Sequence, residues 1–142
     1  MIISSFRVEQ RLVTREEKRR AAWNELTCIL GEIDEAVDAL IVEGQRDVEA
    51  LRSLGLVKPI FRGSSPGRLQ VDLVEEIAKS FLRVVILTDF DEEGRGLNKK
   101  LAGILKQRGV KVAETYRRKV GRVLGALKVS TIESLSKLKE EM

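Results

Sequence analysis

The sequence predicts an α/β fold in which a four-stranded parallel sheet is flanked by helices. Two observations support this prediction: short apolar runs alternate along the chain with helical patterns, and each run is apolar throughout instead of at every second residue. Strands of that kind are buried on both faces, as in parallel sheets covered by helices. With 142 residues, of which 43% are hydrophobic, the chain can bury one such core.

We divide the chain into an N-terminal helical extension (1–36), an α/β domain (37–114) and a basic C-terminal segment with a short helix (115–142). In the extension, apolar residues recur every three or four positions from Thr14 to about Glu35, as on one face of a helix. Thr14 and Glu17 have the spacing of a capping box. We expect this helix to pack against the sheet or against a neighbouring subunit, and the second arrangement would make the protein a homodimer.

The α/β domain is expected to contain four strands and three helices. The strands are predicted at residues 39–42, 57–61, 84–87 and 110–113. The helices between them are predicted at residues 47–54, 69–81 and 92–108. Gly55 and Gly109 follow the first and third of these helices, at the position where glycine commonly ends a helix. Beyond the domain, Ser130 and Glu133 resemble a second capping box and predict a short C-terminal helix.

The composition excludes several classes of protein. The chain has a single cysteine, Cys28, and no histidine, so an internal disulfide is excluded and a zinc site is not expected. A metal ion would therefore have to be held by oxygen. No apolar run approaches the roughly 20 residues that span a bilayer, so no membrane partner is expected. The charged start of the chain does not resemble a secretory signal, which predicts a cytoplasmic protein.

Basic side chains are concentrated near the C-terminus. The whole chain has a net charge of +4, and no acidic residue occurs between residues 115 and 128. The basic residues there are Arg117, Arg118, Lys119, Arg122 and Lys128. Such a cluster suits the phosphate backbone of a nucleic acid, although a solvated charged tail would have the same composition.

Acidic residues follow two of the four predicted strands. Glu43 and Gly44 end the first strand, and Asp89, Asp91 and Glu93 follow the third. Ligands of open parallel sheets bind beyond the carboxyl ends of the strands, where the connections reverse direction. If the first and third strands are neighbours, as in the order 2-1-3-4, these acids converge in one crevice.

Several ionised carboxylates in one crevice repel each other unless a proton or a cation neutralises them. Mg²⁺ suits such a site because it prefers hard oxygen ligands, and Mn²⁺ is the alternative ion. Favourable interaction with the dipole of the following helix would account for Glu92 and Glu93 alone. It does not explain why Asp89 and Asp91 stand at the end of the most apolar strand, so the pattern favours a metal site.

Two other acidic motifs fit less well. In a calcium-binding loop that begins at Asp89, position twelve would be Lys100, where a bidentate glutamate is required. A phosphatase with a nucleophilic aspartate usually has threonine two residues beyond its second aspartate, where this chain has Glu93. The calcium loop is rejected, and a small-molecule phosphatase remains an alternative.

The two acidic motifs resemble those of the Toprim domain family. Residues 41–47, Ile-Val-Glu-Gly-Gln-Arg-Asp, are similar to the family's Glu-Gly motif after the first strand. Residues 87–94, Leu-Thr-Asp-Phe-Asp-Glu-Glu-Gly, are similar to its Asp-x-Asp motif after the third strand. The resemblance implies Glu43 as general acid and base, Asp89 and Asp91 as Mg²⁺ ligands, and Glu93 as a third ligand. Asp47 would lie near this site or only cap its helix.

The Toprim family includes topoisomerases, primases and nucleases, and the chain departs from the first two. Its one tyrosine, Tyr116, lies in the basic segment, and a mass of 16.0 kDa leaves no room for a strand-gating domain or a zinc module. The chain resembles a small stand-alone Toprim protein, similar to the ribosomal-RNA maturation nucleases. This resemblance implies a Mg²⁺-dependent hydrolase that processes RNA or DNA. The alternative is a non-catalytic binding subunit. In either case Arg117, Arg118, Lys119 and Arg122 are expected to contact the nucleic-acid backbone.

Overall fold

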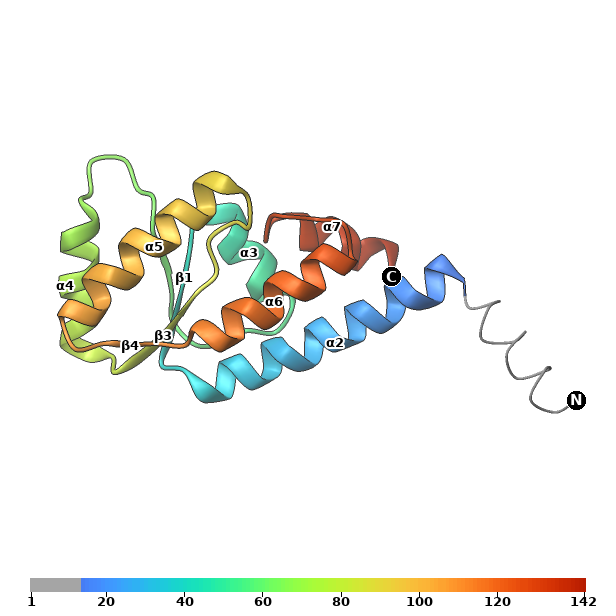
Figure 1. Cartoon of the computed structure of the whole chain (residues 1–142), viewed down its shortest axis with the longest axis horizontal. Helices are drawn as coiled ribbons and strands as arrows, with labels where there is room; N and C mark the ends of the chain where they lie inside the picture. Colours follow the sequence, from blue (N-terminus) through green and yellow to red (C-terminus); the bar gives the residue numbers. More distant parts are fainter. Residues whose placement is uncertain (1–13) are drawn as a thin grey trace, which may run out of the picture.

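The computed structural model describes residues 14–142 and shows an α/β fold built on one parallel sheet (Figure 1). Its strand order is β2-β1-β3-β4, and all three neighbouring pairs are parallel. This is the order 2-1-3-4 considered from the sequence. The first and third strands are therefore neighbours at the centre of the sheet, and their carboxyl ends lie at the same edge.

The four strands are short and differ in burial. They are β1 (Ala39–Val42), β2 (Ile60–Arg62), β3 (Arg83–Ile86) and β4 (Lys111–Val112). All four residues of β1 are buried, as expected for a central strand covered on both faces. Strand β2 begins three residues later than predicted, because the backbone N–H groups of Val57 and Lys58 are bound by the carboxylate of Asp34 instead of a neighbouring strand.

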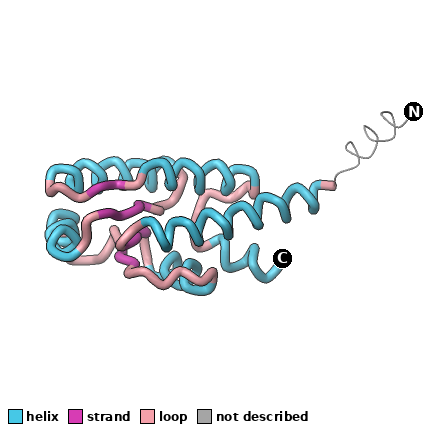
Figure 2. The backbone as a smooth tube through the Cα atoms, turned by 90° about the horizontal axis from the view of Figure 1, so that it is seen from below, coloured by secondary structure: helices cyan, strands magenta, loops and turns pink. Residues whose placement is uncertain are grey.

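Helices cover both faces of the sheet, so that the strands run between them (Figure 2). One face carries α2 (Arg15–Ala36), α3 (Gln45–Ser53), α6 (Glu114–Ala126) and α7 (Ser134–Glu141). The other carries α4 (Gln70–Ser80) and α5 (Glu92–Gln107). Successive residues of a strand point to opposite faces. Accordingly, Leu40 and Val42 join the first core and Ala39 and Ile41 the second.

Helix α2 begins as its sequence predicts. The Thr14 hydroxyl accepts a hydrogen bond from the Glu17 backbone N–H, and the Glu17 carboxylate accepts one from the Thr14 N–H, which completes the capping box. Its apolar side, which includes Leu26, Leu30 and Ile33, is buried within the chain, where α2 packs along α6. The structure therefore gives no support to a homodimer through this helix, since α6 already covers the apolar face that a second subunit would need.

Helix α6 was not predicted from the sequence. The segment was interpreted from its basic residues alone. Its apolar residues also recur at helical spacing, and all of them are buried: Val120, Val123, Leu124 and Leu127. The second capping box was also predicted wrongly. The last helix, α7, begins at Ser134 with Glu133 before it, and no side-chain capping bond forms there.

No helix among residues 14–142 combines the length and the apolar character that crossing a membrane requires. The predicted N-terminal extension is described only from Thr14, and its first thirteen residues lie outside the described part of the chain.

Candidate functional site

The acidic residues after β1 and β3 meet at one edge of the sheet. Glu43 directly follows β1, and Asp89 follows β3 by three residues. The two strands pair in parallel, with Ile41 opposite Ile86, so the chain leaves both strands side by side. The backbone N–H of Asp89 donates a hydrogen bond of 3.2 Å to Oε1 of Glu43. The sequence separation of 46 residues is thus closed by the strand order, as the acidic pattern predicted.

Asp47 joins the same cluster from the first turn of α3. Its side chain is only 5% exposed, and Oδ2 accepts a hydrogen bond of 3.0 Å from the backbone N–H of Gly44. Burial raises the pKa of the Asp47 carboxyl, the Gly44 N–H opposes the rise, and the nearby Glu133 carboxylate adds to it. The sequence left open whether Asp47 caps its helix or lies near the acidic site. The structure shows that it does both, since it caps α3 and lies beside Glu43.

Asp89 is the most strongly perturbed acid of the cluster. Burial, together with the negative charges of Glu43 and Asp47, raises its pKa to about 7. The backbone N–H of Ile132 opposes this rise by donating a hydrogen bond of 3.3 Å to Oδ1. Burial also raises the pKa of Glu43, and the charges of Asp91 and Asp47 add to that effect. The site therefore holds more negative charge than its hydrogen bonds balance.

Asp91 and Glu93 lie at the exposed start of α5. Asp91 is the N-cap residue, and its Oδ1 accepts a hydrogen bond of 2.8 Å from the backbone N–H of Gly94. Glu93 lines a pocket of about 290 Å³ together with Glu43, Ser64 and Lys100. Glu43 therefore touches both parts of the site, since it binds the Asp89 backbone and faces the same pocket as Glu93.

The turn between β3 and α5 has room only for glycine at position 94. A Cβ atom on Gly94 would overlap the carbonyl group of Asp89 and lie 2.8 Å from the Asp89 Cα. The buried Thr88 hydroxyl donates a hydrogen bond of 2.7 Å to the Gly94 carbonyl oxygen. These contacts hold the loop in a tight turn, which directs both aspartates of the motif toward the edge of the sheet.

Arg117 is not at the surface, where we expected it to contact a phosphate backbone. It is 8% exposed, and its guanidinium donates hydrogen bonds to the carbonyl oxygens of Ile86 (3.1 Å), Thr88 (2.9 Å) and Asp89 (3.2 Å). Burial lowers its pKa to about 10, which leaves it charged at neutral pH, and its guanidinium also lies 4.3 Å from the centre of the Phe90 ring. Arg117 thus supports the acidic loop from within, because α6 turns this side chain toward β3.

The other three basic residues predicted to bind nucleic acid are at least partly exposed on α6. Arg118 donates a hydrogen bond of 3.2 Å to the Thr115 hydroxyl, and the Lys119 ammonium lies 5.4 Å from the centre of the Tyr116 ring. Arg122 forms an exposed ion pair of 3.7 Å with Glu25 of α2. These three residues are placed where a ligand can reach them, and their binding role stays a prediction.

The C-terminal segment contributes to the site in a way that the sequence did not reveal. The Ser130 carbonyl oxygen accepts a hydrogen bond of 2.7 Å from the Phe90 backbone N–H, and the Ile132 N–H binds Asp89. Residues 130–133 therefore close the acidic cluster on one side. Backbone groups make these contacts, so no residue type in the segment could have signalled them.

The donor set fits a hard divalent cation. Glu43, Asp47, Asp89 and Asp91 provide only oxygen. Burial, and after it the negative charges of Glu43 and Asp47, raises the pKa of Asp89 to about 7, and a cation would relieve that repulsion. The side chains are not arranged as a finished cage, because no three acidic side chains within residues 14–142 stand close enough to share one ion. The residues fit Mg²⁺ in the chemistry of their donor atoms.

The strand order and the two acidic motifs define the class of protein. The sequence model of the Toprim domain matches residues 38–120, from the start of β1 into α6. The chain therefore belongs to the Toprim domain family. This membership indicates metal-dependent processing of nucleic acid in general.

The relatives of the chain are small proteins that it matches over most of their length. UPF0292 protein PH1700 of Pyrococcus horikoshii is 35% identical over 116 residues, which cover 82% of this chain and 85% of that protein. UPF0292 protein PYRAB04740 of Pyrococcus abyssi is 38% identical over 110 residues, or 78% and 80% of the two chains. A solved protein structure from Aquifex aeolicus aligns with a TM-score of 0.62 at 25% identity, covering 75% of this chain and 94% of the other.

Proposed function

We propose that this protein is a Mg²⁺-dependent Toprim nuclease that hydrolyses phosphodiesters in RNA or DNA. The observation that supports it most directly is the contact between Glu43 and Asp89, which unites acids from two strand ends in one cluster. The raised pKa of Asp89, to about 7, adds support because perturbed acids in a crevice are typical of functional sites.

In this proposal Asp89 and Asp91 hold the metal ion and Glu93 is a third ligand. Bound Mg²⁺ supplies a Lewis acid and lowers the pKa of water for attack on a phosphodiester. Asp89 is half-buried beside Glu43 and Asp47, whereas Asp91 and Glu93 are exposed at the first turn of α5. The ligands thus stand between the protein interior and the surface that a substrate would approach.

Glu43 is proposed to move the proton of the reaction. Burial raises the pKa of its carboxyl group, so the group gains and loses a proton closer to neutral pH than an exposed glutamate does. Its Oε1 is positioned by the Asp89 N–H, and the side chain lines the 290 Å³ pocket. Arg117 places a buried positive charge beneath the loop and so helps the acids to remain together.

A second candidate function is a nucleic-acid-binding subunit without catalysis. It is favoured by the hydrogen bonds that two proposed ligands already make, since Oδ1 of Asp89 accepts from Ile132 and Oδ1 of Asp91 accepts from Gly94. A site whose acids only cap helices and bind backbone would not need a metal ion.

The test is cleavage of labelled structured RNA, single-stranded RNA and single-stranded DNA in Mg²⁺, Mn²⁺ or EDTA. We expect metal-dependent cleavage by the parent and a loss of about 100-fold or more in Asp89→Asn and Glu43→Gln. Glu49→Gln, an exposed glutamate on α3, is the matched control and should cleave like the parent. Equal cleavage by Asp89→Asn and the parent would refute the nuclease.

Two other outcomes would support the alternative functions. Binding without cleavage, unchanged in Asp89→Asn, would favour the binding subunit. Turnover of an aryl phosphate that is lost in Asp89→Asn, with no cleavage of nucleic acid, would favour a small-molecule phosphatase.

A further inference from the structure

A groove of about 420 Å³ runs between α5 and α6, next to the acidic cluster. Its lining includes Phe90, Arg95, Lys99, Arg118 and Gly121. Phe90 stands between the two aspartates of the Asp-x-Asp motif, and its ring packs against Gly121, where a Cβ atom would lie 2.9 Å from the ring. One wall of the groove is therefore part of the same loop that carries the proposed metal ligands.

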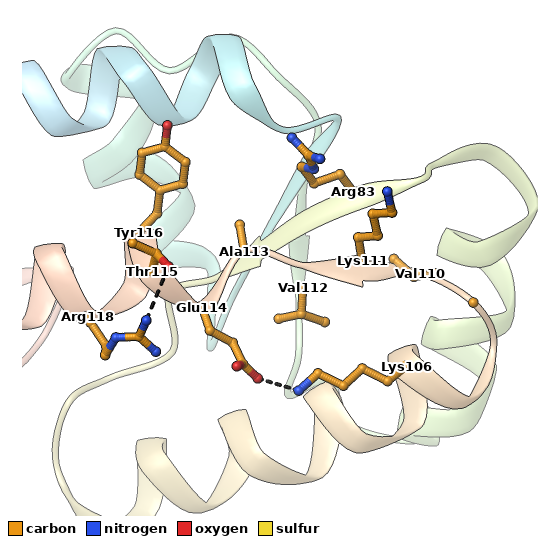
Figure 3. A pocket seen from close by; sticks show the side chains of 11 residues that line it. Arg83, Lys106, Val110, Lys111, Val112, Ala113, Glu114, Thr115, Tyr116 and Arg118 are labelled. Atoms are coloured by element: carbon orange, nitrogen blue, oxygen red, sulfur yellow. Dashed lines mark hydrogen bonds and ion pairs between the residues drawn. The ribbon is translucent and has the colours of Figure 1, made fainter.

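The mouth of this groove is positively charged. Arg95, Lys99 and Arg118 are exposed, and none of them forms an ion pair with an acid of residues 14–142. Glu114 also lines the groove, but its carboxylate is paired with Lys106 at 2.5 Å, a contact drawn in Figure 3. The cations at the mouth are therefore available to an anion, and the one acidic side chain of the lining is largely neutralised.

The spacing of these cations suits the backbone of a nucleic acid. Arg95 and Lys99 are one turn apart on α5, about 6 Å along the helix axis, which is comparable to the separation of neighbouring phosphates on one strand. Arg118 faces the groove from α6 and completes a set of three cations on two walls. Long exposed side chains of this kind bind phosphates without reading base sequence.

We propose that the α5–α6 groove binds one strand of nucleic acid through its sugar–phosphate backbone and leads it past Phe90 to the acidic cluster. The part of this inference that concerns the destination of the strand depends on the proposed function, whereas binding in the groove does not. Arg95 and Lys99 thereby join Arg118 on the proposed binding surface, whereas Arg117, which also lines the groove, is buried and bound to backbone carbonyls.

The dimensions of the groove favour a single strand. A groove of about 420 Å³ lined by residues of α5 and α6 can take a few linked phosphates and sugars, whereas a duplex is too wide to enter it and could only lie across its mouth. Phe90 offers an apolar surface inside the groove, to which a sugar or a base can pack.

The chain offers a matched control on the other side of β4. Arg83 and Lys111 line a neighbouring pocket of about 700 Å³, which shares Glu114 and Arg118 with the groove. Neither of them lines the groove itself, and both are exposed and form no ion pair with acids of residues 14–142. Figure 3 draws them in the lining of this pocket, with Arg83 and Lys111 on one side of β4 and Glu114 and Lys106 on the other. Each pair contains one arginine and one lysine, so removal of either pair changes the net charge equally.

The experiment compares Arg95→Gln/Lys99→Gln with Arg83→Gln/Lys111→Gln by fluorescence anisotropy. The probes are a labelled single-stranded RNA of about 16 nucleotides, DNA of the same sequence and the corresponding duplex, all in EDTA so that nothing is cleaved. For single strands we expect the groove variant to bind about tenfold or more weakly, with the slope of log K against log salt reduced by about 1.4, since two cations are removed. The control variant should bind within about twofold of the parent.

Each outcome decides the proposal. Equal losses in the two variants, no binding by the parent, or duplex binding that exceeds single-strand binding would overturn it. Stronger binding of RNA or of DNA would identify the nucleic acid. If Asp89→Asn and the parent bind alike and neither cleaves, the nuclease proposal fails while the groove proposal stands, so the two failures can be told apart.

A second measurement tests directly whether a bound strand lies in the groove. Acetylation of lysines in the parent, read by mass spectrometry with and without the single-stranded probe, should show protection of Lys99 and none of Lys111. Protection of both lysines to the same extent, or of Lys111 alone, would contradict a strand lying in the groove.

Discussion

The acidic strand ends and the basic helix α6 both stand out in the sequence as clusters of like charge. The fold brings the acidic residues together, whereas it divides the basic residues between the interior and the surface. Asp89 is brought from a distant part of the chain to Glu43 and Asp47, which are near neighbours in the sequence. In contrast, Arg117 and Arg118 are neighbours in the chain, yet the first is buried under the acidic loop and the second is exposed beside the groove.

The difference comes from the geometry of the two kinds of element. Neighbouring parallel strands end at the same edge of a sheet, so residues that follow them converge however far apart they are in sequence. Consecutive residues of a helix point about 100° apart, so a run of like charges on a packed helix is divided between its interior and its surface. A charge cluster is therefore informative at strand ends and ambiguous on an amphipathic helix.

The largest effect is expected at the turn that holds the acidic loop. Gly94→Ala would press a methyl group into the Asp89 carbonyl, so we expect a loss of about 3–5 kcal/mol in the free energy of unfolding. Gly96→Ala on the same helix is the control, since nothing lies within 4 Å of a Cβ there, and it should be neutral or stabilising by up to about 1 kcal/mol. Denaturation in urea measures both. Equal stability of the two variants would mean that the loop does not depend on this close contact.

The contrast between Arg117 and Arg118 can be tested directly. Arg117→Met removes the donors for three backbone carbonyls, so we expect a loss of about 3 kcal/mol in the free energy of unfolding. Arg118→Met changes an exposed side chain and should stay within about 0.5 kcal/mol of the parent. The order should reverse for binding of a single strand in the variants that remain folded. Arg118 is exposed beside the groove, whereas Arg117, which also lines it, is buried and bound to backbone carbonyls. Similar stabilities for both variants would mean that Arg117 does not stabilise the fold more than Arg118 does.

The smallest effect concerns the charge of Asp89 and depends on pH. Its pKa is about 7 in the folded protein, against an ordinary value of 3.8 for an aspartate, so between about pH 4 and pH 7 the folded state holds a proton that the unfolded state has lost. The contribution of Asp89 to stability therefore falls as pH rises through this range. Asp89→Asn should match the parent near pH 4 and exceed it by about 1–2 kcal/mol at pH 8, a figure reduced for solvent screening.

Thermal unfolding at a series of pH values measures this difference. At pH 8, Mg²⁺ should raise the Tm of the parent and not that of Asp89→Asn, because an ion that binds only the folded acidic cluster stabilises it. Asp72→Asn, at an acid in the first turn of α4, is the control and should follow the parent at every pH. A constant difference between Asp89→Asn and the parent across the pH range would show that Asp89 is not perturbed.

Local patterns in the sequence were sufficient for much of the fold. The capping box at Thr14, the buried runs of β1 and β3 and the glycine stops at Gly55 and Gly109 all follow from neighbouring residues, and Gly55 and Gly109 have the positive φ expected of them. Helix α6 could have been found by the same reasoning from its apolar spacing. The second capping box failed because Ser130 and Ile132 bind the acidic loop through their backbone and hold the chain out of a helix there.

The sequence by itself determined which residues are proposed to carry the chemistry: carboxylates after two apolar strands, with a glycine after each, whose types and spacing depend only on local chain geometry. The tertiary structure decided which of the charged side chains are buried and what they contact. It joined Glu43 to Asp89, buried Arg117, brought residues 130–132 against the aspartates and opened a groove between α5 and α6. These are contacts between residues far apart in the chain, and their energies depend on burial and on distances that exist only once the elements have packed.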